Sequence, residues 1–360
     1  MPLIPIAAPE ALQRLDSFSA VIDARSESEF ALDRLPGAVN WPSLNDAERA
    51  SIGTEYKQVS PFAARKRGAM LVARNVAAHL ERHVLELPRD WSPLVYCWRG
   101  GQRSGALGLV LGQIGFRVHV LEGGYQAFRR AVVAELETLP ARLSFVVVCG
   151  VTGSGKSLLL RALAERGEQV LDLEALANHR GSVLGLVPGE AQPSQKAFDT
   201  AIWHAVRNLD PTRPVFVESE SAKVGDLRVP AALVERMRAA ACVRLELPID
   251  ARVALLMREY AFFVRDVDAF CARLDALRVL RGHEAVNGWQ DAARAGRIES
   301  VVRELLVSHY DPIYLQSIRR NFPGTAAPLA QLRWDGDDAG LRAAAAAAAA
   351  LRSPCSPAPD

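Results

Sequence analysis

The stretch LSFVVVCGVTGSGKS, at residues 143–157, decides the fold. It begins with an apolar, β-branched run that is typical of a buried strand. It continues as Gly150-x-x-x-x-Gly155-Lys156-Ser157 and leads into the helix-favouring run SLLLRALAERG. A strand, a glycine-rich loop and a helix in this order form the context that a phosphate-binding loop, or P-loop, requires. The sequence therefore predicts a P-loop domain of the α/β class.

In such a loop the backbone N–H groups turn toward a phosphate, and the helix N-terminus adds the positive end of its dipole. Lys156 would neutralise phosphate oxygens, and the Ser157 hydroxyl would hold Mg²⁺. The residues predicted to bind phosphate are Gly150, Gly153, Ser154, Gly155, Lys156 and Ser157. The motif alone leaves the ligand open, because ATP and an organic diphosphate present the same two-phosphate geometry.

A carboxylate that supports the metal is expected at the end of a neighbouring strand. Asp172 and Glu174 follow the apolar run QVL, and Glu218 and Glu220 follow PVFV. Any of the four is also compatible with a solvated loop. We predict Glu218 as the Mg²⁺ ligand beside Ser157, because four apolar residues lead directly into it.

The N-terminal half also alternates strands with helical stretches, which predicts a second parallel sheet. Its expected strands include AVIDA at 20–24, SPLVYC at 92–97 and FRVHVLEGG at 116–124. The segment TLPAR separates this half from the P-loop strand. We therefore predict a first domain over residues 1–138 and a P-loop domain over 139–335, which is helical from Ala251 to about Asn321. Residues 336–360 are an alanine-, proline- and serine-rich stretch that we expect to be a tail.

A cysteine loop lies between an expected strand and an expected helix, with the sequence Cys97-Trp-Arg99-Gly-Gly-Gln-Arg103-Ser104. Backbone N–H groups at a helix N-terminus stabilise an anion, so the pKa of Cys97 should be lowered. Arg99 and Arg103 add positive charge. This loop would hold a persulfide, a perselenide or an oxyanion. The other cysteines in apolar runs, Cys149, Cys242 and Cys271, are typical of structural positions.

Composition narrows the class of protein. The 360 residues are 49% hydrophobic and 23% charged, with a net charge of +2. These values fit a globular protein and exclude a strongly basic nucleic-acid coat, although not a local basic patch. No apolar run approaches the roughly 20 residues that span a bilayer, and the first residues are not typical of a secretory signal. The few scattered cysteines favour a reducing cytosol, so we expect a cytoplasmic protein without membrane contact.

The cysteine loop resembles the active-site loop of rhodanese domains. The resemblance extends to VIDARSESEF and LPGAVNWP within residues 21–42, where Asp33-Arg34-Leu35 replaces the histidine that the family often has before its Pro-Gly turn. A rhodanese-like domain joined to a P-loop domain resembles the tRNA 2-selenouridine synthase family over about residues 5–325. Four further segments support the resemblance: YKQVSPFAARKRGA at 56–69, NHRGSVLG at 178–185, PSQKAFD at 193–199 and VESESAKVG at 217–225.

The resemblance implies a transferase that acts on the wobble uridine, position 34, of tRNA in two steps. The sulfur of 2-thiouridine first takes a geranyl group from geranyl diphosphate. Selenium from selenophosphate then replaces the geranylthio group and gives 2-selenouridine. The P-loop with Mg²⁺ would serve the first step. Cys97, as nucleophile or selenium carrier, would serve the second with Arg99 and Arg103.

The resemblance also implies contacts outside these two loops. The loop residues His179, Arg180, Gly181 and Ser182 are candidate substrate contacts, or a simple turn. Lys57, Arg65, Lys66 and Arg67 form one candidate basic surface for tRNA, and Arg319 with Arg320 another, although charged runs are often only solvated. AFFV at 261–264 could line a geranyl pocket but is more typical of helix core. A selenophosphate-producing enzyme is a possible partner, and a monomer is favoured.

Three other functions stay open. An ATP-dependent kinase or NTPase with a rhodanese-like regulatory domain would hydrolyse nucleotide or transfer a phosphoryl group. A thiosulfate sulfurtransferase would transfer sulfur to cyanide through the N-terminal half alone. A non-catalytic tRNA-binding protein would tolerate loss of both Cys97 and Lys156. The selenouridine function ranks first because only it uses both loops and the segments between them.

Overall fold

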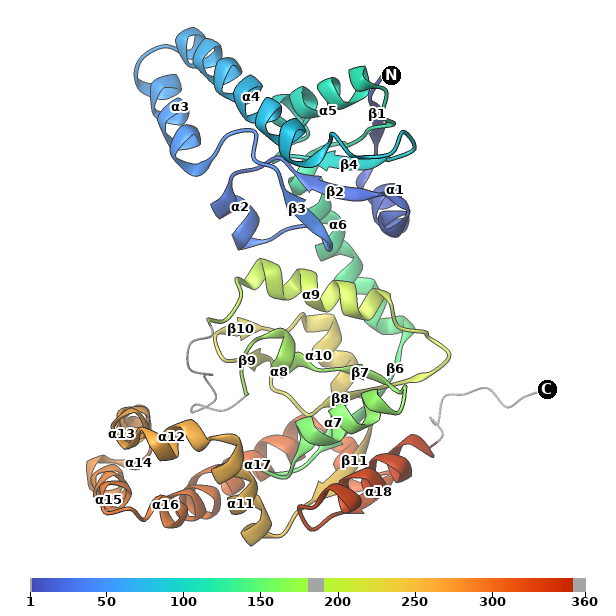
Figure 1. Cartoon of the computed structure of the whole chain (residues 1–360). Helices are drawn as coiled ribbons and strands as arrows, with labels where there is room; N and C mark the ends of the chain where they lie inside the picture. Colours follow the sequence, from blue (N-terminus) through green and yellow to red (C-terminus); the bar gives the residue numbers. More distant parts are fainter. Residues whose placement is uncertain (1, 181–190, 352–360) are drawn as a thin grey trace, which may run out of the picture. The chain divides into compact units, whose positions relative to one another are not determined.

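A computed structural model describes residues 2–180 and 191–351 (Figure 1). The chain forms two compact units. The first comprises Met1–Glu135 together with Pro193–His204, and the second comprises Leu136–Gln192 together with Ala205–Asp360. Within the described residues, no helix combines the length and the apolar character that a membrane crossing requires.

The first unit is built on a five-stranded parallel sheet in the order β1-β5-β4-β2-β3. Its core includes Ile22, Val95, Leu107 and Leu111, all fully buried. The strands are β1 (Ile4–Ile6), β2 (Ala20–Asp23), β3 (Ala38–Asn40), β4 (Pro93–Tyr96) and β5 (His119–Leu121). The helices are α1 (Ala8–Gln13), α2 (Glu27–Leu32), α3 (Asp46–Gln58), α4 (Pro61–His83), α5 (Gln102–Ile114) and α6 (Gly124–Thr138).

Part of helix α9 (Gln195–Arg207) belongs to this first unit, although we expected the whole stretch in the P-loop domain. The carboxylate of Asp33 accepts hydrogen bonds from the Tyr125 hydroxyl at 2.7 Å and the Thr200 hydroxyl at 3.2 Å. The fully buried Trp203 packs edge-to-face on Phe128 and donates its indole N–H to a carboxylate. These contacts explain why residues 193–204 are part of the first unit.

The second unit is built on another five-stranded parallel sheet, in the order β12-β11-β6-β8-β7. The parallel α/β architecture predicted for both halves is confirmed. The strands are β6 (Ser144–Cys149), β7 (Gln169–Leu171), β8 (Pro214–Glu218), β11 (Ala241–Glu246) and β12 (Ala330–Arg333), with a separate ribbon of β9 (Lys223–Val224) and β10 (Leu227–Arg228). The helices near this sheet are α7 (Lys156–Glu165), α8 (Leu173–Leu176), α10 (Ala231–Arg238) and α18 (Asp338–Ala349).

The second unit also contains the predicted helical part, which follows β11 (Figure 1). This part has a core of its own around Phe270, Leu274, Val286 and Trp289. Its helices are α11 (Ile249–Glu259), α12 (Ala261–Arg265), α13 (Val267–Leu274), α14 (Arg278–Arg281), α15 (His283–Arg294), α16 (Ile298–Glu304) and α17 (Asp311–Asn321), with a π-helical turn over Leu305–Tyr310.

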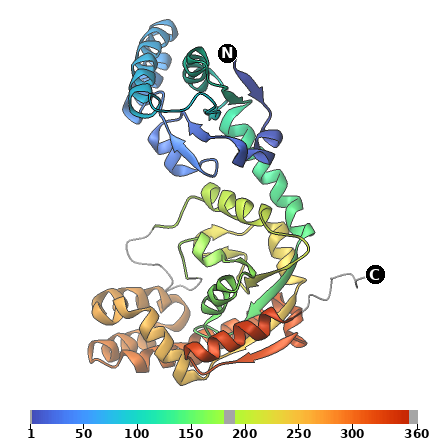
Figure 2. The same cartoon turned by 45° about the vertical axis from the view of Figure 1, so that its right-hand side comes forward.

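The prediction that residues 336–360 form a tail is wrong for α18, which packs into the core of the second unit. Ala344, Ala345 and Ala348 are buried in the same core as Leu159 and Leu163 of α7, and α18 lies against the P-loop sheet (Figure 2). Small side chains allow two helices to approach closely, so the alanine run has a packing role up to Ala349. Residues 352–360, the end of the expected tail, lie outside the described residues.

Candidate active sites

Cys97 directly follows β4, and its thiol is almost fully buried at the N-terminus of α5. Its Sγ accepts hydrogen bonds from the Gly101 N–H at 3.3 Å and the Ser104 hydroxyl at 3.2 Å. Burial disfavours the thiolate, but these bonds and the charge of Arg103 outweigh it, so the pKa of Cys97 lies below its ordinary value. The loop therefore stabilises an anion on this sulfur.

The cysteine loop is held from behind by the start of α6. The N–H groups of Tyr125 and Gln126 donate to the carbonyls of Cys97 and Trp98. Gly124 is required here, because a Cβ at this position would lie 2.2 Å from the Cys97 carbonyl oxygen. The close approach fixes the loop backbone, and with it the direction of the N–H groups that face the sulfur.

The two arginines of this loop have different surroundings. Arg103 forms an ion pair with Glu29 at 2.8 Å, and Glu29 also contacts Arg49 at 3.1 Å. Arg99 is exposed and forms no ion pair within residues 2–180 and 191–351. Arg99 is therefore the cation that is available to an incoming anion, whereas Arg103 supports the charge of the loop.

The P-loop connects β6 to α7, as the motif predicts. Gly155 has a φ of 87°, and a Cβ there would lie 2.4 Å from the indole ring of Trp334. That indole donates its N–H to the Ser154 carbonyl at 3.0 Å. Only glycine fits this position, where the loop turns into the helix against a buried aromatic ring.

Lys156 is half-buried at the base of this loop. Its Nζ donates to the Gly150 carbonyl at 2.9 Å and lies 4.8 Å from the centroid of the Tyr314 ring. Burial lowers the pKa of Lys156, but Tyr314 and the neighbouring glutamates raise it more strongly, so the ammonium stays charged. A cation held at the base of a P-loop suits the oxygens of a diphosphate.

Three carboxylates gather beside Ser157. Glu174, Glu218 and Glu220 each offer an oxygen within 4.8 Å of the others, and the Ser157 hydroxyl donates to Glu174 at 2.9 Å. Burial and the other carboxylates raise the pKa of Glu218, and they raise that of Glu220 to about 8. Asp172, the fourth sequence candidate, instead caps α8.

The donor set fits a divalent cation. Glu218 is fully buried, and its Oε2 has no hydrogen-bond partner within the described residues. Hard oxygen ligands of this kind are those that Mg²⁺ prefers. Ser157, Glu174, Glu218 and Glu220 would hold the ion, which would neutralise charge on a bound diphosphate.

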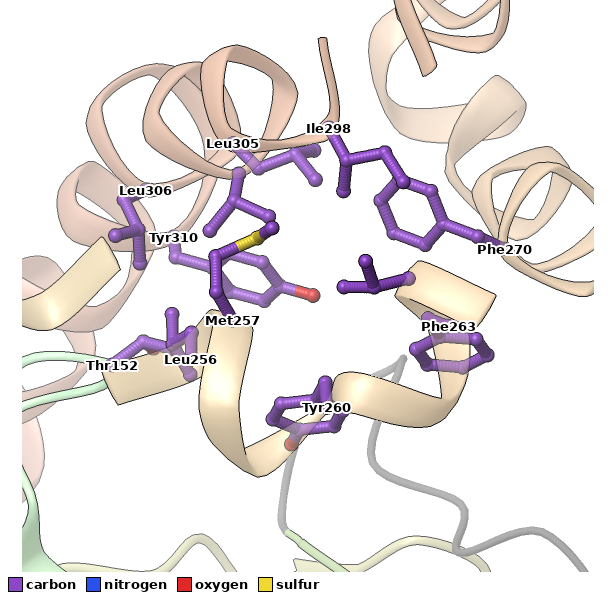
Figure 3. A pocket seen from close by; sticks show the side chains of 12 residues that line it. Thr152, Leu256, Met257, Tyr260, Phe263, Phe270, Ile298, Leu305, Leu306 and Tyr310 are labelled. Carbon is purple, nitrogen blue, oxygen red and sulfur yellow. The ribbon is translucent and has the colours of Figure 1, made fainter. Parts of the chain in front are cut away.

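An apolar pocket opens beside Thr152, which lies between Gly150 and Gly155 of the P-loop (Figure 3). The space is narrow, about 60 Å³. One side of the pocket is formed by Leu256 and Met257 of α11 and by Tyr260, which directly follows that helix. The wall also includes Phe263 and Val264 of α12. The other lining residues are Phe270, Ile298, Val302, Leu305, Leu306 and Tyr310. The AFFV segment therefore contributes to a pocket as well as to the helical core.

Comparison with known proteins now assigns the family. The sequence model of the tRNA 2-selenouridine synthase AAA domain matches residues 143–278, and that of the rhodanese-like domain matches residues 7–131. A tRNA 2-selenouridine synthase of a Sulfurovum species is 33% identical over 331 residues, which cover 84% of this chain and 89% of that protein. The chain belongs to the tRNA 2-selenouridine synthase family.

Other relatives carry the same name. The synthase of Chromohalobacter salexigens is 37% identical, over 67% of this chain and 64% of the relative. That of Cronobacter sakazakii is 36% identical, over 78% of this chain and 72% of the relative. Among solved structures, a rhodanese-related protein of Thermoplasma volcanium covers 36% of this chain and 92% of its own, with 20% identity and a TM-score of 0.24. This last likeness adds nothing to the fold assignment.

Several residues that support the P-loop were not predicted from the sequence. The buried Arg252 donates to the Thr152 carbonyl at 2.9 and 2.7 Å, and its guanidinium binds both carboxylate oxygens of Asp311. Tyr314 and Trp334 contact the loop as described above. Arg252 is 100 positions beyond Thr152 in the sequence, and Trp334 is 180 positions beyond Ser154. No local sequence signal links them to the loop.

The predicted substrate loop is described in part. His179 is buried, and its Nδ1 has no hydrogen-bond partner within the described residues. Arg180 lies 4.9 Å from the ring of Tyr260, a residue of the apolar pocket, and donates to the Glu259 carbonyl at 2.8 Å. Gly181 and Ser182 lie outside the described residues.

Proposed function

We propose that this chain converts 2-thiouridine at the wobble position, 34, of tRNA into 2-selenouridine through a geranylated intermediate. The observation that carries the proposal is the apolar pocket beside Thr152 of the P-loop. A nucleoside triphosphate needs no apolar pocket at this point. An isoprenoid diphosphate needs both a phosphate loop and an apolar pocket for its chain. Membership of the synthase family supports tRNA as the other substrate.

In the first step, the sulfur of 2-thiouridine attacks C1 of geranyl diphosphate. The C1–oxygen bond breaks, diphosphate leaves, and the N3 proton of the uridine passes to solvent. Diphosphate is a poor leaving group until its charge is neutralised. Lys156 and the P-loop N–H groups would bind its oxygens, and the carboxylates beside Ser157 would hold Mg²⁺ against them.

In the second step, selenium from selenophosphate bonds to C2 of the base. Geranylthiol leaves, water takes the phosphorus to give phosphate, and N3 regains a proton. The cysteine loop suits this chemistry because it stabilises an anionic chalcogen on or beside Cys97. Arg99, which is exposed and without an ion pair within the described residues, would attract selenophosphate. A separate selenophosphate-producing enzyme would supply this substrate.

The tRNA would bind in part to the hairpin of α3 and α4. The two helices pack on each other, and Val59 between them and Phe62 at the start of α4 are 76% and 68% accessible. Lys66 lies 4.9 Å from the Phe62 ring, and Arg67 pairs with Glu55. Exposed cations next to an exposed aromatic ring suit an RNA loop, which offers phosphates and unstacked bases. Lys57 and Arg65 extend the same basic surface.

Nucleoside mass spectrometry tests the proposal. The protein is incubated with tRNA that contains 2-thiouridine, Mg²⁺ and geranyl diphosphate, and then with selenophosphate. We expect a geranylthio-uridine peak that converts to selenouridine. Unchanged tRNA, with ATP hydrolysed in a parallel reaction, would refute the proposal and favour a nucleotide-dependent enzyme. Sulfur transfer from thiosulfate to cyanide without any tRNA product would favour a sulfurtransferase.

A further inference from the structure

A second cavity lies where β6, β11 and β12 end, at the carboxyl edge of the P-loop sheet. Its volume is about 470 Å³, and we call it the arginine cavity because Arg244, Arg319 and Arg333 line it. Its wall also includes Gly150 and Val151, the first residues of the P-loop. Open α/β sheets bind their ligands in crevices at this edge, so the position alone makes the cavity a candidate site.

The lining of the arginine cavity differs from that of the apolar pocket. Three arginines face two carboxylates, those of Glu246 and Asp335. Glu246 pairs with both Arg244 and Arg333, at 3.1 and 3.0 Å. Arg319 forms no ion pair within the described part of the chain. The cavity therefore keeps a positive charge, and a guanidinium group is well suited to phosphate oxygens.

The cavity also offers surfaces for a ring. The side chains of Tyr314, Leu315 and Ile318, on one side of α17, line it together with Trp334. Aromatic and aliphatic side chains of this kind pack against the face of a base, with a gain of about 1–3 kcal/mol for base stacking on an aromatic ring. Positive charge and ring-binding surface together are the requirements of a nucleotide.

Tyr314 links this cavity to the diphosphate site. Its ring lines the cavity and also lies 4.8 Å from Lys156 Nζ. Its hydroxyl shares a hydrogen bond of 2.6 Å with Ser219, which follows β8. A ligand in the arginine cavity would thus be separated from the lysine of the P-loop by one aromatic side chain.

We propose that the arginine cavity binds a nucleotide, with its phosphate at Arg319 and its base against Tyr314 and Leu315. The inference rests on the proposed function, in which this nucleotide is the wobble nucleotide of the tRNA, turned out of the anticodon stack as RNA loops allow. The acceptor sulfur then approaches from the arginine cavity, while the isoprenoid chain occupies the apolar pocket. Free ATP has the same chemistry and is the other source of such a ligand.

Binding of two probes tests the inference and separates the sources. One probe is an anticodon stem–loop RNA with 2-thiouridine at the wobble position, and the other is ATP with Mg²⁺. The variants are Arg319→Ala, which removes the unpaired cation, and Leu315→Trp, which fills the cavity from a side chain that is 37% accessible. The control is Arg342→Ala, an exposed arginine of α18 that does not line the cavity.

We expect both cavity variants to weaken RNA binding roughly 10-fold, the value of one charge-assisted contact, with Arg342→Ala within about 2-fold of wild type. ATP binding that falls in the same two variants would instead support the cavity with a free nucleotide as its ligand. RNA binding that falls while ATP binding stays unchanged supports the wobble nucleotide as the ligand. The inference is overturned if neither variant weakens the binding of any probe that wild type binds, or if wild type binds neither probe. If wild type still forms geranylthio-uridine in that case, the proposed function survives alone. If wild type does not modify the RNA at all, the proposed function fails, and the ATP titration still tests the cavity.

Discussion

At Cys97, burial and hydrogen bonding act on the thiol in opposite directions. Burial raises the pKa, while donation from Ser104 and Gly101 and the charge of Arg103 lower it, and the lowering prevails. The thiolate is therefore present above a pKa that lies below 9.0 and is lost as the pH falls through that value. We predict that Ser104→Ala raises the pKa of Cys97, because one donor to Sγ is removed. The measurement is thiolate absorbance against pH, taken as the difference between each protein and its Cys97→Ala counterpart.

The matched control is Ser51→Ala, a serine of α3 with no contact to this loop in the described structure. Its titration should superimpose on that of wild type. The rate of selenium transfer should follow the same titration if the thiolate is the reacting form. A Ser104→Ala protein that titrates at or below the wild-type pKa would contradict the assignment of this hydrogen bond as a stabiliser of the anion.

Among single residues, the sequence predicted the site residues that are neighbours in the chain. The P-loop residues and the cysteine loop are contiguous motifs, and the fold keeps them as such. Glu218 was predicted from the apolar run before it, and the structure brings Glu174 and Glu220 to the same place. Arg252, Tyr314 and Trp334 were not predicted, because each meets the P-loop only through the tertiary fold.

Helices α11 and α17 are joined at the P-loop by the ion pair of Arg252 and Asp311, at 2.6 Å. We predict that Arg252→Met leaves the Thr152 carbonyl and Asp311 without their donor. The free energy of unfolding should fall by about 2–3 kcal/mol, somewhat less than for a fully buried pair because Asp311 is partly exposed. The KM for geranyl diphosphate should rise roughly 10-fold, because the loop loses its support. Denaturant titration and steady-state kinetics measure the two effects.

A second ion pair provides the control for Arg252. Arg303 and Asp250 also connect α11 to a later helix, at 2.6 Å, but both side chains are well exposed. Arg303→Met should change stability by less than about 0.5 kcal/mol and leave KM unaltered. Equal effects of the two substitutions would show that the P-loop does not depend on Arg252 in particular.

Helix α18 yields a prediction about packing. Ala345 is fully buried, whereas Ala343 of the same helix is exposed. Ala345→Leu should lower the free energy of unfolding by about 1–3 kcal/mol, because three extra carbons must enter a filled core. Ala343→Leu should change it by less than about 0.5 kcal/mol, since leucine and alanine both favour helix. If the two variants melt alike, the alanine run is not part of the core.

The composition of helix α18 explains why it was expected to be part of a tail. Alanine runs have high helix propensity but show no apolar periodicity, since every position carries the same residue. The face of α18 that becomes buried is therefore determined by the helix that it packs against, here α7 with Leu159 and Leu163. The place of α9 was not predicted for a different reason: its contacts with Asp33 and Phe128 join segments far apart in the sequence.

In the molecule as a whole, each candidate site lies within one unit. Cys97 and the loop around it belong to the first unit, and the P-loop, its carboxylates and the apolar pocket belong to the second. Under the proposed function, the leaving diphosphate is bound by side chains of the second unit, and the anionic chalcogen is stabilised by side chains of the first. Under the proposed function, the geranylated tRNA is therefore a true intermediate that one site makes and the other consumes.

The order of addition tests this division of roles. Cys97→Ala should still form geranylthio-uridine, because the diphosphate site is untouched, and should stop there. Lys156→Ala should form none, because the leaving diphosphate loses the cation at the base of the P-loop. When RNA that Cys97→Ala has geranylated is isolated and given to Lys156→Ala with selenophosphate, we expect selenouridine, read by nucleoside mass spectrometry. The double variant Cys97→Ala with Lys156→Ala is the control and should leave that RNA unchanged. A folded Lys156→Ala protein that cannot use the isolated intermediate would mean that the P-loop unit also takes part in the selenium step.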